Sequence, residues 1–547
     1  MNSINNLVHL CIKNKKNKTI VLLVTLFAFL FSVYLLPLEV VKAKMLPGKD
    51  SNTFTVYVDL PTGSSIYETK KVTDGVVGVL QKEKEVLDSE VFLGTSSPLD
   101  FAGLVKMSGL KSGENFAEIV VNILKKHDRE EPSFLMAQRL RIEINKVVEK
   151  INPKATIKMV EPPAGPPVLA AIVAEIYGDN YNSIEKLAKR VEKVFKKTDG
   201  LVDIDIIGDD DYEKYEYILD YEKIKRLGIR VSSVTDLLET AFNGKVINTK
   251  NSSKYSTQID LFMRTKQRDF DVENALSSLK VKSSNGNLVP LVSIVKVKKV
   301  KNEKTIYSKD LKTMLNVVAE TDMVSQIYPL LDARTFIKEN FGDEYKVTSA
   351  NMLNLWLTDK KTGEKLKLVW DGELKVTLDT FRDLGGAFIA ALVLIFLLMV
   401  VYYKNFALSG IVLLSSFLSI IGVIFGHLFV DIVTTHTFFL TATSLIGFIA
   451  LIGISSRNAL LLIDFTKHLV ANGTEKKEAI ATSASIRAKP IILTAASIIL
   501  ASILLANDAV FGGLGVSLIF GTIAAVIASI FVVPVLIDNI DESVLKA

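Results

Sequence analysis

The sequence predicts a polytopic α-helical membrane protein with six transmembrane helices and a large α+β region of ferredoxin-like split βαβ subdomains. Apolar residues are gathered in separate blocks of roughly 18 or more nearly uncharged residues, each long enough to cross a hydrocarbon core as a helix. Basic residues cluster beside these blocks. The long segment between the first and second blocks alternates strand-like and helix-like patterns, with Pro and Gly at the joints, so we expect it to be folded.

The orientation follows from basic residues near the ends of the candidate spans. The spans are Ile20 to Leu38, Leu384 to Tyr403, Phe406 to Val430, Thr437 to Phe465, Pro490 to Leu505 and Gly515 to Ile537. The basic residues are Lys13, Lys15, Lys16, Lys18, Lys404, Lys467, Lys476, Lys477, Arg487 and Lys489. We therefore predict a cytoplasmic N-terminus (1–19), a retained first helix (20–38), a segment on the far side (42–383), helices 2 to 6 (384–537) and a cytoplasmic tail (538–547).

The far-side segment reads as two αβ subdomains. Strand, helix, strand, strand, helix and strand patterns follow each other from "TFTVYVDLP" to "ATIKMV", which is the split βαβ order. After the hinge-like "EPPAGPP" (161–167) the order begins again with "VLAAIVAEIYG". A β-rich insertion interrupts this second subdomain at about 244–300, and strand-helix-strand then resumes toward the membrane.

Composition excludes several classes of function. The net charge of +5 is small for 547 residues, and the basic residues lie beside apolar segments, which argues against nucleic-acid binding. The single cysteine, Cys11, cannot form an internal disulfide. No phosphate-binding glycine loop, serine nucleophile elbow or HExxH motif occurs, so we expect neither ATP use nor enzymatic activity. The histidines and the cysteine form no ligand cluster; His427 and His436 read as interfacial side chains.

Arg457 stands inside the fourth apolar block, in "GISSRNALLLIDF". A charge at membrane depth costs at least a few kcal/mol, so we expect it to face the bundle interior and to have a partner. The alternative is an arginine whose guanidinium extends to the headgroups. Asn458 beside it and Asp464 on the same helical face suggest a polar seam, but two turns of helix, roughly 10 Å, make a direct ion pair between Arg457 and Asp464 improbable. Asp464 could equally be an ordinary interfacial carboxylate.

Two further features of the helices are structural expectations. Thr494 follows Pro490, which suits a first helical turn, and a membrane threonine most often bonds its own helix backbone. Four glycines should permit close helix packing. They are Gly512, Gly513, Gly515 and Gly521.

Four stretches carry a resemblance to a known family. They are "LPGKDSNTFTVYVDLPTGSSIYET", "DYEKIKRLGIRVSSVTDLLETAFNGKVI" with "NLVPLVSIVKVK", "GISSRNALLLIDF" and "RAKPIILTAAS". In this order the chain resembles the carboxy-terminal half of a resistance-nodulation-division (RND) efflux pump permease, the inner-membrane subunit of tripartite exporters in Gram-negative bacteria. The resemblance implies a bacterial inner-membrane protein in a trimeric assembly, with a periplasmic adaptor and an outer-membrane channel docked on the insertion. The far-side segment would then be periplasmic.

The resemblance also implies roles for the residues in the membrane. Arg457 would be the cation that responds to a pair of aspartates in the other half of the permease, with Asn458 as its polar neighbour and Thr494 and Arg487 as supporting members of the relay. Arginine is effectively never deprotonated in proteins, so Arg457 could respond to a proton but not carry one. The aspartate pair is absent from this sequence. We therefore predict a partner half that supplies the carboxylates, with the proton motive force and no cofactor as the energy source.

The predicted function is proton antiport by a half-size transporter subunit that exports hydrophobic or amphiphilic compounds. Five methionines of the far-side segment are scattered and read as core or cleft wall rather than copper ligands, which favours this branch over heavy-metal export. They are Met107, Met136, Met159, Met263 and Met323. One alternative is a related module that moves or senses lipids, or assists protein export, without an outer-membrane channel. Another is a scaffold half that has lost transport.

Overall fold

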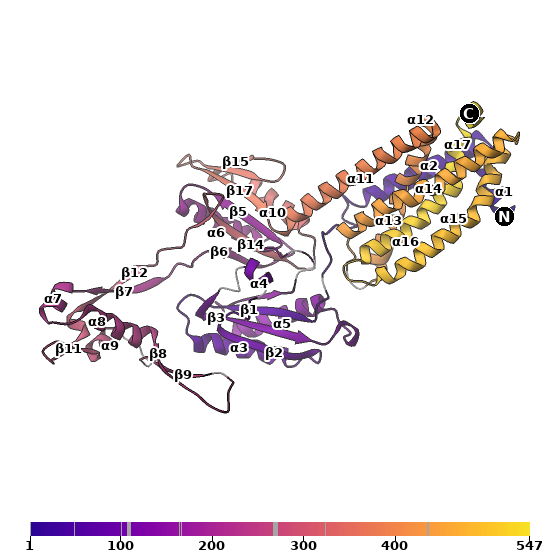
Figure 1. Cartoon of the computed structure of the whole chain (residues 1–547). Helices are drawn as coiled ribbons and strands as arrows, with labels where there is room; N and C mark the ends of the chain where they lie inside the picture. The colour runs from indigo at the N-terminus through magenta and orange to yellow at the C-terminus, as the bar shows by residue number, and fades with distance from the viewer. Residues whose placement is uncertain are drawn as a thin grey trace. The chain divides into compact units, whose positions relative to one another are not determined.

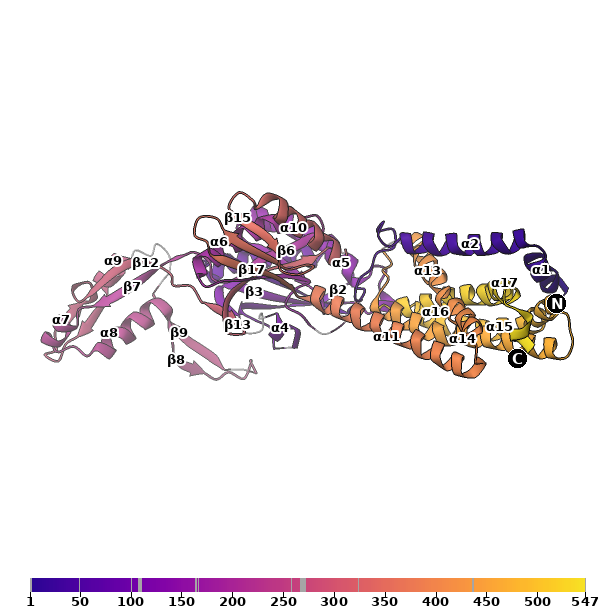
Figure 2. The same ribbon diagram turned by 90° about the horizontal axis from the view of Figure 1, so that it is seen from above.

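The computed structural model describes residues 2–48, 50–99, 101–106, 111–162, 165, 167–256, 258–265, 272–322, 324–434 and 437–546. Met107, Met323, His436 and three positions of the predicted hinge lie outside these residues. The chain divides into two compact units, one of Met1–Gly208 with Ile306–Ala547 and one of Asp209–Thr305. Figure 1 and Figure 2 show the elements of both units from two directions.

Six helices of the described residues are long and apolar enough to cross a membrane. In chain order they are α2 (Lys15–Tyr34), α11 (Glu373–Tyr403), α12 (Phe406–Phe417) continuing into α13 (Ser419–Val433), α14 (Ala442–Ala471), α15 (Lys476–Ala506), and α16 (Gly512–Ile527) continuing through the π-helical turn Ala528–Val532 into α17 (Val533–Asp538). Helix α16 packs against α13, α14 and α15, and it runs among them in Figure 1. The apolar stretches of α2 and α11 are almost entirely exposed, so lipid can contact them.

Local sequence sets the ends of these helices. Asn405 caps α12 by accepting hydrogen bonds from the backbone of Ala407 and Leu408. Thr441 and Ser444 form a reciprocal capping box at the start of α14. Pro490, expected in a first helical turn, instead lies inside α15, which begins at Lys476. A proline is tolerated there because neighbouring helices can satisfy the backbone groups that it frees.

The N-terminal residues contribute a helix of their own. Helix α1 (Asn2–Ile12) packs against α15, burying Val8 and Ile12 completely. Lys18, at the start of α2, forms an ion pair of 2.6 Å with Asp538 of α17. The beginning and end of the described membrane region are therefore joined on one side of the bundle.

The first subdomain has the predicted split βαβ order. Its strands are β1 (Thr53–Asp59), β2 (Val86–Thr95), β3 (Ser112–Ile123) and β4 (Thr156–Val160), in the sheet order β2-β3-β1-β4. Helices α3 (Ile66–Leu80) and α5 (Ser133–Ile151) connect them, and a short α4 (Phe101–Val105) precedes β3. Their apolar faces share one core with the sheet; Val56 of β1, Val76 of α3 and Ile144 of α5 are fully buried in it. The order of these elements along the chain is strand, helix, strand, strand, helix and strand, apart from the short α4.

The second subdomain has a larger sheet. The strands run in the order β13-β14-β5-β17-β16-β15, with β6 also paired to β14. They are β5 (Ile172–Tyr177), β6 (Leu201–Ile207), β13 (Tyr307–Lys309), β14 (Lys312–Thr321), β15 (Tyr345–Ser349), β16 (Leu355–Asp359) and β17 (Lys365–Asp371). Helices α6 (Tyr181–Phe195) and α10 (Ile327–Asn340) share a core with one face of the sheet.

The unit Asp209–Thr305 begins well before residue 244, where the sequence pattern first suggested an insertion. A ribbon of β7 (Glu213–Leu219) and β12 (Val295–Lys301) leads into it and out of it. Between these strands lie α7 (Tyr221–Arg226), α8 (Val231–Leu238), a π-helical turn (Glu239–Asn243), the hairpin β8 (Lys245–Lys250) with β9 (Ile259–Met263), α9 (Val272–Ser278), and β10 (Lys280–Lys282) with β11 (Leu288–Pro290). The insertion therefore contains helices as well as strands, and Val234 of α8 and Leu276 of α9 are buried in one core.

Candidate functional site

Arg457 lies on the exposed face of α14. The exposed residues in this part of the helix are Ile446, Ala450, Gly453 and Arg457, and their spacing of three and four places them on one face. Arg457 forms no hydrogen bond or ion pair with any residue that the structure describes. The expected orientation toward the interior of this bundle is therefore wrong. An unpaired cation on an apolar helix face at membrane depth requires contact with another chain, another part of the protein, or the headgroups.

The other residues of the predicted relay occupy separate surroundings. Asn458 is buried, with 2% of its surface exposed. Thr494 is exposed on α15, and its hydroxyl donates to the carbonyl of Ile491 at 2.9 Å in its own helix. The guanidinium carbon of Arg487 lies 4.7 Å from the centre of the Phe465 ring, and its buried Nε has no hydrogen-bond partner among the described residues. No hydrogen bond or ion pair joins these described side chains to one another.

Asp464 belongs to a contact between α14 and α11. Its carboxylate accepts hydrogen bonds from the hydroxyls of Tyr402 at 3.1 Å and Tyr403 at 2.9 Å. The ammonium group of Lys467 lies 5.8 Å from the Tyr403 ring centre. The acid that the sequence associates with Arg457 is thus held by two tyrosines at the end of α11, the second of the long apolar helices.

Sequence reasoning missed the polar contacts that connect the buried helix faces. His427 of α13 is fully buried, and its imidazole is bonded to the Ser444 hydroxyl and to the Val423 carbonyl, each at 2.8 Å. The expectation of an interfacial His427 is therefore wrong. Ser415 and Ser455 meet between α12 and α14 at 3.2 Å. The small residues around His427, such as Gly426, were the available sequence signal, because they allow helices to approach closely enough for side chains to bond across them.

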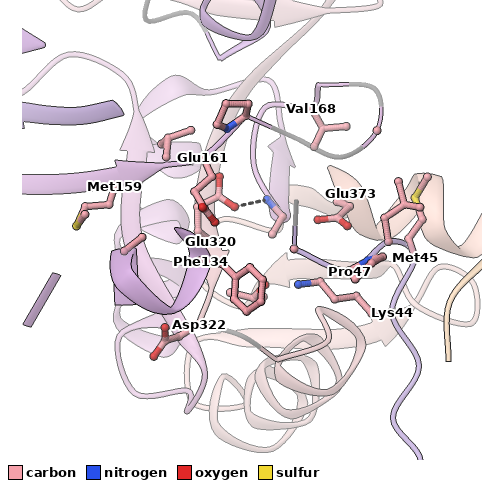
Figure 3. Close-up of a pocket in the computed structure, with 18 of the residues that line it drawn as sticks. Lys44, Met45, Pro47, Phe134, Met159, Glu161, Val168, Glu320, Asp322 and Glu373 are labelled. Atoms are coloured by element: carbon pink, nitrogen blue, oxygen red, sulfur yellow. Dashed lines mark hydrogen bonds between the residues drawn. The ribbon is translucent and has the colours of Figure 1, made fainter. Parts of the chain in front are cut away.

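A cavity of about 210 Å³ lies where the two soluble subdomains meet the start of α11. Figure 3 draws Lys44, Glu161, Glu320 and Glu373 around it, together with Phe134. Lys106 of the first subdomain bonds Glu320 of the second at 2.7 Å. The wall thus combines charged groups with apolar side chains.

A second ion pair across the subdomains lies beside this cavity. Arg141 on α5 bonds Asp203 on β6 at 3.1 Å and lies 3.5 Å from Asp322. The Asp203 carboxyl is itself almost fully buried. Breaking such a buried pair leaves an uncompensated charge, so the two subdomains are coupled at this point.

Glu161 follows β4 on the wall of the cavity. Burial raises the pKa of its carboxyl from 4.5 to about 7, against the opposing effect of a hydrogen bond from Ser133. One of its buried oxygens has no hydrogen-bond partner among the described residues. The folded protein therefore holds this carboxyl protonated at a pH where an exposed glutamate is ionised.

A pH-dependent stability follows from Glu161. Because its folded-state pKa is raised, the carboxyl stabilises the folded state below about pH 4.5, and that contribution, on the order of 1 to 3 kcal/mol, is lost as the pH rises through about 7. We expect Glu161→Gln to remove most of this loss. The measurement is the thermal unfolding midpoint of the chain in detergent between pH 5 and pH 8. Glu149→Gln, at an exposed position of α5, is the control. If the unfolding midpoint changes with pH equally in the two variants, the pH dependence does not come from Glu161.

The fold and this site define a class of protein in which αβ subdomains are inserted between the first and second of several long apolar helices, with an exposed arginine, Arg457, on α14. The family comparison identifies that class. The chain belongs to the AcrB/AcrD/AcrF family of RND permeases, whose model matches residues 2–540.

Individual relatives have low sequence identity over most of this chain. The Swarming motility protein SwrC of Bacillus subtilis is 24% identical over 534 residues, covering 95% of this chain and 46% of that protein. The Multidrug export protein AcrF of Escherichia coli is 22% identical over 516 residues, covering 90% and 45%. The Nickel and cobalt resistance protein CnrA of Cupriavidus metallidurans is 24% identical over 381 residues, covering 68% and 33%. This chain thus spans half or less of the length of these relatives.

A solved structure shares the fold. The crystal structure of a heavy metal efflux pump superimposes with a TM-score of 0.72 at 19% identity, covering 98% of this chain and 51% of that one. Both multidrug and metal transporters are therefore among the proteins similar to this chain.

Proposed function

We propose that this chain is a half-size subunit of a proton-driven RND-type efflux transporter, with the proton-binding carboxylates on a partner half. The observation that carries the proposal is the position of Arg457 on the exposed, otherwise apolar face of α14. A cation on an apolar helix face is costly at membrane depth unless an anionic group or the headgroups meet it, and none of the described residues bonds Arg457. A partner helix bearing carboxylates against this face would neutralise it.

The relatives contain sequence beyond the region that this chain matches. Its relatives are about twice as long, and the matched region is less than half of each. The partner half is either a separate polypeptide or a further part of the same one. In either case Arg457 would respond to the protonation of the partner's carboxylates, since arginine keeps its own proton. Asn458 would be the polar neighbour of Arg457, and Arg487 and Thr494 would be supporting members of the relay.

For the substrate we propose a hydrophobic or amphiphilic compound. Among the described residues no group of three or more His, Cys, Asp or Glu side chains is arranged to hold a metal ion. Met136 and Met159 lie in the core of the first subdomain, and Met263 is exposed on β9 of the other unit. The cavity near Glu161 instead combines apolar side chains with several charged groups of both signs, a mixture that suits an amphiphile.

The assembly belongs to the same proposal: a trimeric inner-membrane complex among membrane lipids, with a periplasmic adaptor and an outer-membrane channel. The compact unit Asp209–Thr305 supports it, because a separate unit at this point of the chain offers a surface for docking. A lipid-transporting, lipid-sensing or protein-export module without a channel is the second candidate. It would not require a docking unit of this size.

The decisive experiment is to isolate the chain from its own membrane in mild detergent and to identify the copurifying polypeptides by mass spectrometry. We expect a partner with six spans and paired aspartates within them, or the same features in a longer form of this chain. Export by a reconstituted complex that contains no other membrane carboxylates would overturn the proposal.

A further inference from the structure

A second cavity, of about 430 Å³, lies on the sheet of the second subdomain. Side chains along a strand alternate between its two faces. Ile176 of β5 and Leu368 of β17 point into the core that the sheet shares with α6 and α10. Glu175, Tyr177 and Lys367 therefore lie on the opposite face, and all three line the cavity.

An aromatic ring forms part of the floor. Trp356 of β16 is paired with Lys367 of β17, which is paired in turn with Tyr177 of β5, so the three side chains lie in one row across three strands. Trp356 is 39% exposed. The Lys367 ammonium lies 5.5 Å from the centre of the Trp356 ring. A flat ligand could stack on this ring with its polar group within reach of Lys367.

Lysines outnumber acids around the cavity. The charged residues of its wall are Lys309, Lys312, Lys365, Lys367, Lys375, Glu175, Asp179 and Asp310. Glu175 is buried and already neutralised, since it bonds Lys309 at 2.6 Å and the Tyr177 hydroxyl at 2.8 Å. Lys309 also bonds Asp371 at 2.8 Å, outside the wall.

The remaining lysines of the wall form weaker ion pairs or none among the described residues. Lys375 lies 3.9 Å from Asp371, and no hydrogen bond or ion pair holds Lys312 or Lys365 among the described residues. Both are exposed on the same sheet as Lys367. The cavity therefore presents a surplus of positive charge beside an aromatic ring.

We propose that this cavity is a binding site for small aromatic organic anions, whose ring stacks on Trp356 while a carboxylate, sulfonate or phosphate group is held by Lys365 and Lys367. The volume falls within the range, roughly 300 to 1,000 Å³, of pockets that bind small molecules. Cations of the same shape are repelled by the lysines. The site is separate from the cavity near Glu161, and its binding activity does not depend on the proposed transport function.

The two tryptophans of the chain allow a direct test. Trp370 is buried and stacked on Phe195, so Trp370→Phe leaves Trp356 as the only indole reporter. The probe is para-nitrobenzenesulfonate, a flat anion that quenches indole fluorescence on contact, added to the full chain in a non-ionic detergent. We expect saturable quenching, and only weak, non-saturating quenching by para-nitrophenyltrimethylammonium, which has the opposite charge.

Charge reversal provides the specificity control. Lys365→Glu with Lys367→Glu should weaken binding of the sulfonate by at least about tenfold, because the two ammonium groups that hold the anion become carboxylates. Lys346→Glu with Lys361→Glu, two exposed lysines outside the wall, should leave it unchanged. If the first pair fails to fold, Lys312→Glu is the substitute, with an expected weakening of about threefold.

Three results would overturn the proposal. One is equal saturable quenching by the cationic probe, and another is unchanged sulfonate binding after charge reversal in the folded variants. The third is binding of a poly-glutamate peptide without any binding of the sulfonate, which would indicate an acidic protein partner instead. A failure of this kind leaves the proposal on Arg457 intact, because no membrane residue takes part in the measurement.

Discussion

Replacing Arg457 with alanine is expected to abolish export and proton coupling while leaving the complex assembled. The side chain projects from an exposed face of α14 and bonds none of the described residues, so its removal leaves no unpaired group inside this chain. In the proposed complex it removes the cation that faces the partner's carboxylates. With no opposite charge nearby, those carboxylates would bind protons more tightly and release them less readily. We expect transport to fall by two orders of magnitude or more, since about 3 kcal/mol corresponds to a factor of about 100.

The measurement is substrate efflux and proton uptake in proteoliposomes that hold this chain with its copurified partner under an imposed pH gradient. Arg457→Lys should retain part of the activity, because the positive charge remains while bidentate pairing is lost. Arg382→Ala, which removes an exposed arginine near the start of α11, should have little effect. Full export by Arg457→Ala would identify this chain as a scaffold half.

The sequence predicts the αβ subdomains in more detail than it predicts the packing of the apolar helices. The predicted helix Ser133–Ile151 coincides with α5 because its apolar residues repeat at helical spacing and leave a polar face. Helices that are apolar all round carry no such signal. The periodicity of α14 therefore could not show that Arg457 would lie on the exposed face, and only the packing of α16 and its neighbours defines that face.

The contacts of the candidate residues could not be predicted from the sequence. Thr494 bonds its own helix backbone, the ordinary behaviour of a membrane threonine. Asp464 accepts hydrogen bonds from Tyr402 and Tyr403, which are about sixty residues away in the sequence and belong to a different helix. Such a contact depends on which helices become neighbours, and this cannot be predicted from a single sequence. The row of Trp356, Lys367 and Tyr177 was missed for the same reason, since it depends on the pairing of three strands.

The largest effect on folding is expected at Gly422, where α13 crosses α16. A Cβ atom at this position would lie well inside contact distance of the Phe520 carbonyl oxygen and 2.6 Å from Cβ of Ala524. Backbone atoms of a neighbouring helix cannot move aside as the end of a side chain can, so the two helices would have to separate. Close approach at small residues is the main source of helix association in a bilayer, where the hydrophobic effect contributes little.

We therefore expect Gly422→Val to prevent accumulation of the folded chain, and Gly422→Ala to destabilise it by about 2 to 3 kcal/mol. The matched control is Gly410→Ala on α12, where an added Cβ meets nothing within 4 Å. Monodispersity in detergent and the thermal unfolding midpoint distinguish the variants. A Gly422→Val protein with the midpoint of the Gly410→Ala control would show that α13 and α16 do not pack as described. Helix α16 also packs against α14. Separating α13 from α16 should therefore change the face of α14 that carries Arg457. Any Gly422→Ala protein that folds should lose export as well as stability.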